Sequence, residues 1–151
     1  MESKYDNTVE VVVAPLIRNA EGKILLIKSP KWGDAYLLPG GHVEASETIF
    51  ETAVREGEEE TGLKLIPRHV VNVGELINDP DYERKAHLIF IHVLCDTEAD
   101  EVRIDGVEIH ESLWMDVHVA VTYPQLAKGI RQTIQNYLDG VEIPFASQLF
   151  D

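Results

Sequence analysis

Three glutamates in the first half of the chain have a spacing that could bind a cation. Glu56, Glu59 and Glu60 stand at positions i, i+3 and i+4, so in a helix with about 100° per residue they project from one face. Like charges at this spacing repel each other, and a bound hard cation would offset that repulsion. Mg²⁺ is the natural candidate because it prefers oxygen ligands and combines a few carboxylates with substrate phosphates. The alternative is a solvated acidic face, the usual meaning of a charge run.

The surrounding segment, Gly40 to Leu63, reads GGHVEASETIFETAVREGEEETGL. It resembles the signature of the Nudix hydrolases, G-x5-E-x7-R-E-U-x-E-E-x-G-U, where U is an aliphatic residue. Gly57 departs from the pattern, because an aliphatic residue is expected there, and we interpret it as a site of close helix-on-sheet approach. The seven fixed positions of the signature are all present at the required spacing: Gly41, Glu47, Arg55, Glu56, Glu59, Glu60 and Gly62.

The resemblance implies a loop-helix-loop that holds divalent cations against a diphosphate. Its metal ligands would be Glu56, Glu59 and Glu60, with a backbone carbonyl from Gly40 or Gly41. Arg55 would orient the glutamates by ion pairing. Glu47, in the first turn of the helix, would pair with Arg55 or support a second metal ion. The candidate catalytic residues from this segment are therefore Glu59, Arg55 and Glu47.

A later acidic loop supplies a further candidate. Members of the family often use a carboxylate from such a loop as base or as an additional ligand, and the stretch Glu108 to Trp114 resembles that loop. We choose Glu108 for this role, with Glu111 as its substitute. The alternative is again a solvated loop.

Substrate contacts are predicted from basic and aromatic residues near loops. The candidates for phosphate contacts are Lys28, Lys31, Arg84 and Lys85, and the candidates for stacking on a base are Trp32, Tyr36 and Tyr82. The alternative for each is an ordinary solvated or packed side chain. Two substrate markers known from subgroups of the family cancel each other, because Pro80 favours ADP-ribose and Tyr82 favours dinucleoside polyphosphates.

The function implied is a Mg²⁺-dependent pyrophosphohydrolase, with Mn²⁺ able to substitute. Its substrate would be a nucleoside triphosphate, ADP-ribose or another nucleoside diphosphate sugar, or a dinucleoside polyphosphate. One alternative is a catalytically weak nucleotide-sensing module, which the intact glutamates argue against. Another is a prenyl diphosphate isomerase of the same superfamily, which would need a catalytic cysteine. The single Cys95 lies in an apolar stretch and is expected to be buried.

These side chains must be positioned by a mixed α/β domain. The resemblance implies an α/β/α sandwich with a mixed central sheet and two main helices, within one domain spanning residues 1–151. Ser46 is the predicted N-cap of the first helix and Gly62 its C-terminal residue. The second helix is predicted over residues 123–138. Strands are predicted over residues 8–18, 23–27, 36–38, 65–76, 86–95 and 113–115.

Charge and hydropathy limit the partners. The 13 Lys and Arg against 27 Asp and Glu give a net charge of −14, which argues against nucleic-acid polymers and anionic membranes as partners. No apolar run approaches the roughly 18 residues of a membrane helix, and the chain starts without a signal-peptide pattern, so we expect a cytoplasmic protein. The tail, residues 141–151, carries Phe145, Leu149 and Phe150, which are expected either to pack on the domain or to form a homodimer contact.

Overall fold

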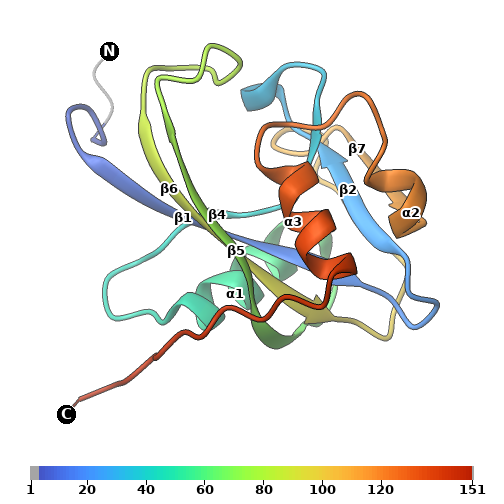
Figure 1. Cartoon of the computed structure of the whole chain (residues 1–151). Helices are drawn as coiled ribbons and strands as arrows, with labels where there is room; N and C mark the ends of the chain where they lie inside the picture. The colour runs from blue at the N-terminus through green and yellow to red at the C-terminus, as the bar shows by residue number, and fades with distance from the viewer. Residues whose placement is uncertain (1–3, 151) are drawn as a thin grey trace.

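The computed structural model describes residues 4–150 and shows one mixed sheet within them (Figure 1). The sheet order is β3-β2-β1-β6-β5, with β4 paired to β1 and β7 paired to β2. The long strands β1 and β6 pair in parallel at the centre, and the other pairs are antiparallel. The strands are β1 (Val9–Arg18), β2 (Ile24–Lys28), β3 (Tyr36–Leu37), β4 (Gly41–His42), β5 (Ile66–Ile77), β6 (His87–Asp96) and β7 (Glu111–Met115).

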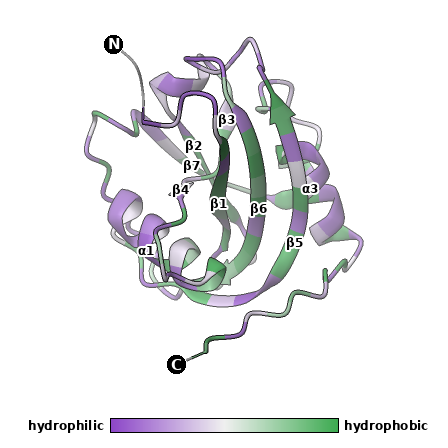
Figure 2. Ribbon diagram, turned by 90° about the vertical axis from the view of Figure 1, so that its left-hand side faces the viewer, coloured by the Kyte–Doolittle hydropathy of each residue, from purple (hydrophilic) through white to green (hydrophobic). Residues whose placement is uncertain are grey.

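Helices cover both faces of the sheet, as Figure 2 shows. Residues alternate between the two faces along β6: Ile91 and Val93 pack in the core cluster under α1, whereas Leu94 packs in the cluster under α3. The predicted α/β/α sandwich with a mixed sheet is thus confirmed. The helices are α1 (Ile49–Thr61), α2 (Val117–Ala120) and α3 (Ile130–Leu138), with a 3₁₀ turn, η1, at Pro30–Trp32.

Helix α1 begins later than predicted. Its N-cap is Thr48, which exchanges hydrogen bonds with Glu51 in a capping box. The prediction of Ser46 as N-cap is wrong, because Ser46 adopts a left-handed conformation with φ 67° in the loop before the helix. The C-terminal Gly62 is confirmed with φ 76°. Gly57 also has the predicted role, since a Cβ there would collide with Leu65 on the sheet side.

The second predicted helix is shorter than expected. Only residues 130–138 form α3, and the segment before it runs beside β3, where Tyr36 donates to the carbonyl of Gln125 and accepts from the N–H of Ala127. The carbonyl of Gln125 and the N–H of Ala127 therefore form hydrogen bonds with the edge strand β3 and not within a helix. The segment ends at Gly129, whose φ of 89° is left-handed.

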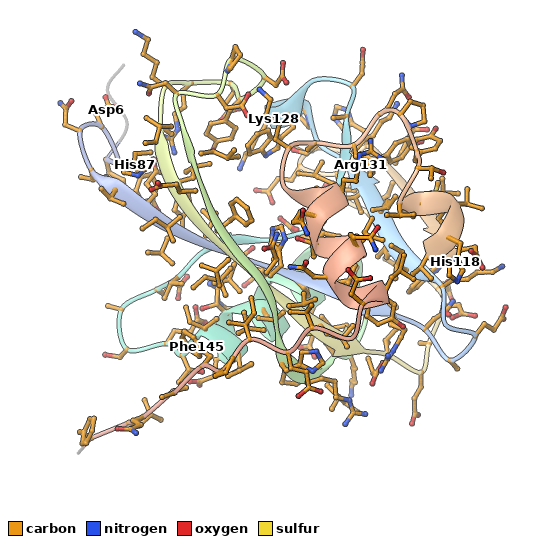
Figure 3. All side chains as sticks on the ribbon, viewed as in Figure 1. Asp6, His87, His118, Lys128, Arg131 and Phe145 are labelled. Carbon is orange, nitrogen blue, oxygen red and sulfur yellow. The ribbon has the colours of Figure 1, made fainter. Side chains whose placement is uncertain are left out.

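Half of the tail packs on its own domain. The N–H of Ile143 donates to the carbonyl of Val70 on β5, and the Phe145 ring meets the edge of Phe50 at a centroid distance of 6.0 Å; Figure 3 labels Phe145 beside α1. Leu149 and Phe150, by contrast, are 75% and 86% exposed. Cys95 is buried as predicted. None of the helices described in residues 4–150 is long and apolar enough to span a membrane.

Candidate active site

Two glycines before α1 let the glutamate face approach the sheet. The N–H of Gly40 donates to Oε2 of Glu60 at 2.8 Å. A Cβ on Gly41 would lie 2.7 Å from Oε2 of Glu56, so only glycine leaves room for that carboxylate. Strand β4, which the sequence did not predict, holds this loop by pairing Gly41 and His42 with β1. The signature therefore fixes the loop and the helix against each other.

Arg55 is the centre of an ion-pair network. Its guanidinium donates to both carboxylate oxygens of Glu47, at 2.6 and 2.9 Å, and to Glu56 at 2.9 Å. Longer contacts reach Glu59 at 3.4 Å and the carbonyl of His42 at 3.1 Å. This is the geometry of an orienting guanidinium. Glu47 precedes the helix instead of lying in its first turn, and its hydrogen bonds with Arg55 lower its pKa to about 2.

For Glu56 and Glu60, nearby positive charge does not outweigh the effect of burial on the pKa. Burial raises the pKa of Glu60 to about 8, and the charges of Glu56 and Glu108 add to this effect. Burial also raises the pKa of Glu56, although Arg55 opposes the shift. Glu59 is more exposed than Glu56, with 59% of its side chain accessible. A partly buried group of carboxylates with too few cations is an environment that favours a bound positive charge.

Glu56, Glu59 and Glu60 line a surface hollow, which we call the acidic hollow. Glu108 lines it as well. Asp105 shapes its loop by accepting the N–H groups of Val107, Glu108 and Ile109 at 2.9 to 3.1 Å. Glu111 lies instead on β7, where it pairs with Lys28 at 3.5 Å. The structure therefore brings Glu108, and not its substitute, to the signature.

The fit to a divalent cation comes from the chemistry of the donors. Within residues 4–150, no three acidic, His or Cys side chains already stand close enough together to hold a metal ion. The hollow nevertheless gathers several carboxylates, from Glu44, Glu56, Glu59, Glu60 and Glu108, beside the backbone of Gly40 and Gly41; its other polar lining side chains are Lys4, Tyr5, Lys31 and His42. Such hard oxygen donors suit Mg²⁺, which keeps several waters and takes few protein ligands.

An apolar cleft opens beside the acidic hollow, and the sequence analysis missed it. The two share Lys31, Gly40, Gly41 and His42. Apolar side chains dominate the cleft, with Trp32 and Tyr82 among its lining residues. Its other lining residues come from β1, β3, β5, β6, the segments after β3 and before α3, and the first residue of α3: Val12, Val13, Ala14, Leu37, Leu38, Leu76, Leu88, Phe90, His92, Ala127, Lys128 and Ile130.

Of the residues predicted to stack on a base, Trp32 and Tyr82 line the cleft, whereas Tyr36 does not. Trp32 lines the cleft, with its ring 4.6 Å from that of Tyr82. Tyr36, which was predicted to stack on a base, is only 8% exposed and packs in the core against Tyr123.

Two of the predicted phosphate contacts, Lys28 and Arg84, line neither the acidic hollow nor the apolar cleft. Lys28 pairs with Glu111. Arg84 forms a bidentate pair with the buried Glu10, at 2.5 and 2.9 Å. The basic residues that line the cleft are Lys31, which was among the predicted phosphate contacts, and Lys128. Figure 3 shows Lys128 near the β5–β6 loop, where it pairs with Asp79.

Comparison with known proteins agrees with the fold and the signature. Residues 8–137 match the family model described as NUDIX domain, so the chain belongs to the Nudix family, a family of hydrolases acting on pyrophosphate bonds. The predicted resemblance, fold and enzyme class are confirmed at this level.

Three similar proteins illustrate the relationship. The chain is 34% identical over 120 residues to an ADP-ribose pyrophosphatase of Methanocaldococcus jannaschii, covering 78% of this chain and 67% of that protein. It is 35% identical over 98 residues to phosphatase NudJ of Escherichia coli K12, covering 62% and 63%. A MutT NUDIX hydrolase structure from Burkholderia pseudomallei superposes with a TM-score of 0.71 at 25% identity, covering 86% and 98%. The chain thus matches less than two thirds of the length of NudJ.

Proposed function

We propose that this protein is a Mg²⁺-dependent pyrophosphohydrolase that cleaves the diphosphate linkage of a nucleotide, with Mn²⁺ able to substitute. One observation carries the proposal: the acidic hollow and the apolar cleft adjoin and share Lys31, Gly40, Gly41 and His42. The two parts of a nucleotide match these two hollows. Its phosphates bind a cation, which the acidic hollow suits, and its base stacks on an apolar, aromatic surface, which the cleft offers. The neighbouring hollows are suited to bind both parts at once.

The signature residues would hold the cation. Glu56, Glu59 and Glu60, with the carbonyl of Gly40, are the proposed ligands, and Arg55 keeps Glu56 in place through the ion pairs described above. A divalent cation bound there would act as a Lewis acid on the phosphoryl oxygens. Glu47 anchors the other side of Arg55 and so supports the ligands indirectly.

Proton transfer is assigned to Glu108. Its carboxylate is exposed, lies in the acidic hollow and comes from a loop opposite the helix, so it can reach a water molecule at the phosphates. The water oxygen attacks phosphorus, Glu108 takes the water proton, and the bond from phosphorus to the bridging oxygen breaks. Lys31 contributes positive charge between the two hollows.

ADP-ribose or another nucleoside diphosphate sugar is the proposed first choice of substrate. The support is the 34% identity to a protein named ADP-ribose pyrophosphatase. Nucleoside triphosphates and dinucleoside polyphosphates are the other classes to compare.

A substrate panel tests this function. Phosphate release after phosphatase coupling is measured for the three substrate classes with Mg²⁺, Mn²⁺, Ca²⁺ or excess EDTA. We expect turnover with Mg²⁺ and Mn²⁺, poor turnover with Ca²⁺, and reversible loss in EDTA. Full turnover in EDTA would contradict the metal assignment. Tight nucleotide binding without turnover of any substrate would indicate the sensing module instead.

A further inference from the structure

A buried polar ring lies in the wall of the apolar cleft. His92, on β6, is 5% exposed and lines the cleft together with Phe90, whose ring centroid is 4.7 Å away. In the sheet its register partners are Ala14 on β1 and Asn72 on β5. His92 does not line the acidic hollow.

One side of the ring is fixed by a hydrogen-bond network. Nδ1 of His92 lies 2.6 Å from Oγ1 of Thr133 on α3. That hydroxyl also accepts from Nδ2 of Asn72 at 2.9 Å and donates to the carbonyl of Gly129 at 3.0 Å. A hydroxyl has one proton and two lone pairs, so when it donates to Gly129 it can only accept from Nδ1. Assigning the hydroxyl proton to the bond with Gly129 places the proton of the neutral ring on Nδ1 and makes Nε2 a hydrogen-bond acceptor.

The ring remains neutral at physiological pH, because burial lowers the pKa of His92 to about 3. Nε2 has no hydrogen-bond partner among residues 4–150. In that same part of the chain, Thr97 Oγ1 is the single fully enclosed side-chain polar atom without a partner. Nε2 therefore still reaches open space, and the open space that His92 lines is the cleft.

Two glycines, Gly74 and Gly129, leave space for the ring of Phe90, which lies next to His92. A Cβ on Gly129 would lie 2.9 Å from Cζ of Phe90, and one on Gly74 would collide with the same ring. Phe90 can therefore lie across the sheet and give the cleft a flat apolar surface beside Nε2. A planar ring bound against this surface can bring one polar edge to the histidine.

We propose that His92 is a specificity-determining residue, whose Nε2 accepts a hydrogen bond from an N–H donor on the edge of a nucleobase bound in the cleft. The proposal rests on the proposed function and adds to it the chemical group that is recognised. An amino group such as that of adenine is the fitting donor. A base without such a donor leaves Nε2 unpaired when it displaces water, which disfavours its binding.

The test compares three ligands that differ in the base. AMP carries the amino group, purine riboside 5′-monophosphate lacks it, and ribose 5-phosphate has no base. Their affinities are measured by NMR titration of the full chain, with ¹⁵N-labelled histidine reporting on the His92 ring nitrogens. His92→Asn can keep the contact to Thr133 but is too short to reach the position of Nε2, whereas His92→Gln reaches it.

We expect the wild type to bind AMP about five- to tenfold more tightly than purine riboside monophosphate, the size of one hydrogen bond. This ratio should fall to about one in His92→Asn and recover partly in His92→Gln. The Nε2 signal of the wild type should shift with AMP but not with ribose 5-phosphate.

Equal affinities for the two purine ligands in the wild type, or an unshifted Nε2 signal on AMP binding, would overturn the inference even if the variants fail to fold. Those results alongside active substrate turnover would reject the role of His92 and leave the proposed function intact. A shifted Nε2 signal without turnover of any substrate would reject the proposed function and retain base recognition.

Discussion

The N–H of Gly40 donates a 2.8 Å hydrogen bond to Oε2 of Glu60 across 20 residues of sequence. This contact joins the loop before β4 to the last turns of α1, so the backbone oxygen and the carboxylates proposed as ligands come to one place. Arg55 makes the second connection, from the helix to Glu47 and to the carbonyl of His42. The residues of the proposed cation site are thus held by the signature's own contacts.

Arg55→Lys should lower the rate of hydrolysis at least tenfold while the protein still folds. Lysine keeps the charge but lacks the planar fork that bonds Glu47 at two points and Glu56 at a third. Steady-state kinetics and circular dichroism would measure the two effects. Arg68→Lys is the control, because Arg68 pairs with Asp96 at the surface and lies outside both hollows. Equal damage by both changes would contradict the orienting role.

Glu60→Gln should stabilise the metal-free protein at alkaline pH. Burial raises the pKa of Glu60 to about 8 in the folded protein, above the value of 4.5 for a free side chain. Folded protein then retains a proton that unfolded chain has lost, so the stability contributed by Glu60 is complete below pH 4.5 and falls as the pH rises towards 8. Thermal melts in EDTA should show the variant with the higher melting temperature at pH 8 and almost no difference at pH 4.5. A variant less stable at pH 8 would contradict this environment.

Phe145→Ala should lower the melting temperature by about 2–4 °C, the shift that roughly 1 kcal/mol gives in a domain of this size. The ring contacts Phe50 of α1 and is 40% exposed, so part of its surface is buried on the domain. Phe150→Ala is the matched control and should leave the melting temperature unchanged, because that side chain is 86% exposed. The reverse order of effects would show that the tail packs differently.

Homodimer formation stays a prediction, and deleting residues 148–151 tests it. The deletion removes the exposed Leu149 and Phe150 but keeps Ile143 and Phe145, which pack on the domain. If the tail forms the dimer contact, light scattering should show a dimer for the full chain and a monomer after the deletion. An unchanged mass would reject the tail as that contact.

The shared helix face of the three signature glutamates could be predicted because helix geometry converts spacing into position. Glu56, Glu59 and Glu60 needed only the helical period to share a face. The N-cap was missed because Ser46 and Thr48 are both good capping residues, and the backbone at Ser46 turned out to be left-handed. Such a conformation is set by the loop as a whole.

The apolar cleft could not be read from local spacing. Ala14 and His92 become neighbours through the parallel pairing of β1 with β6, and Asn72 joins them from β5. The ion pair of Arg84 could not be predicted for the same reason, since its partner Glu10 lies 74 residues away on β1. Alternating Leu88, Phe90 and His92 along one strand was the available signal, and it marks one face of a sheet without showing that the face is open.

The comparison of Glu59→Gln with Glu58→Gln tests the central claim most directly. The two glutamates are adjacent and both exposed on α1, but only Glu59 lies in the acidic hollow. Removing its charge should lower the rate of Mg²⁺-dependent hydrolysis by roughly 10² to 10⁴ with folding intact, the range for a directly participating group. Glu58→Gln should stay within a few-fold of the wild type. Equal rates for the two variants, or an unaffected Glu59→Gln, would contradict the assignment of this helix face to the cation.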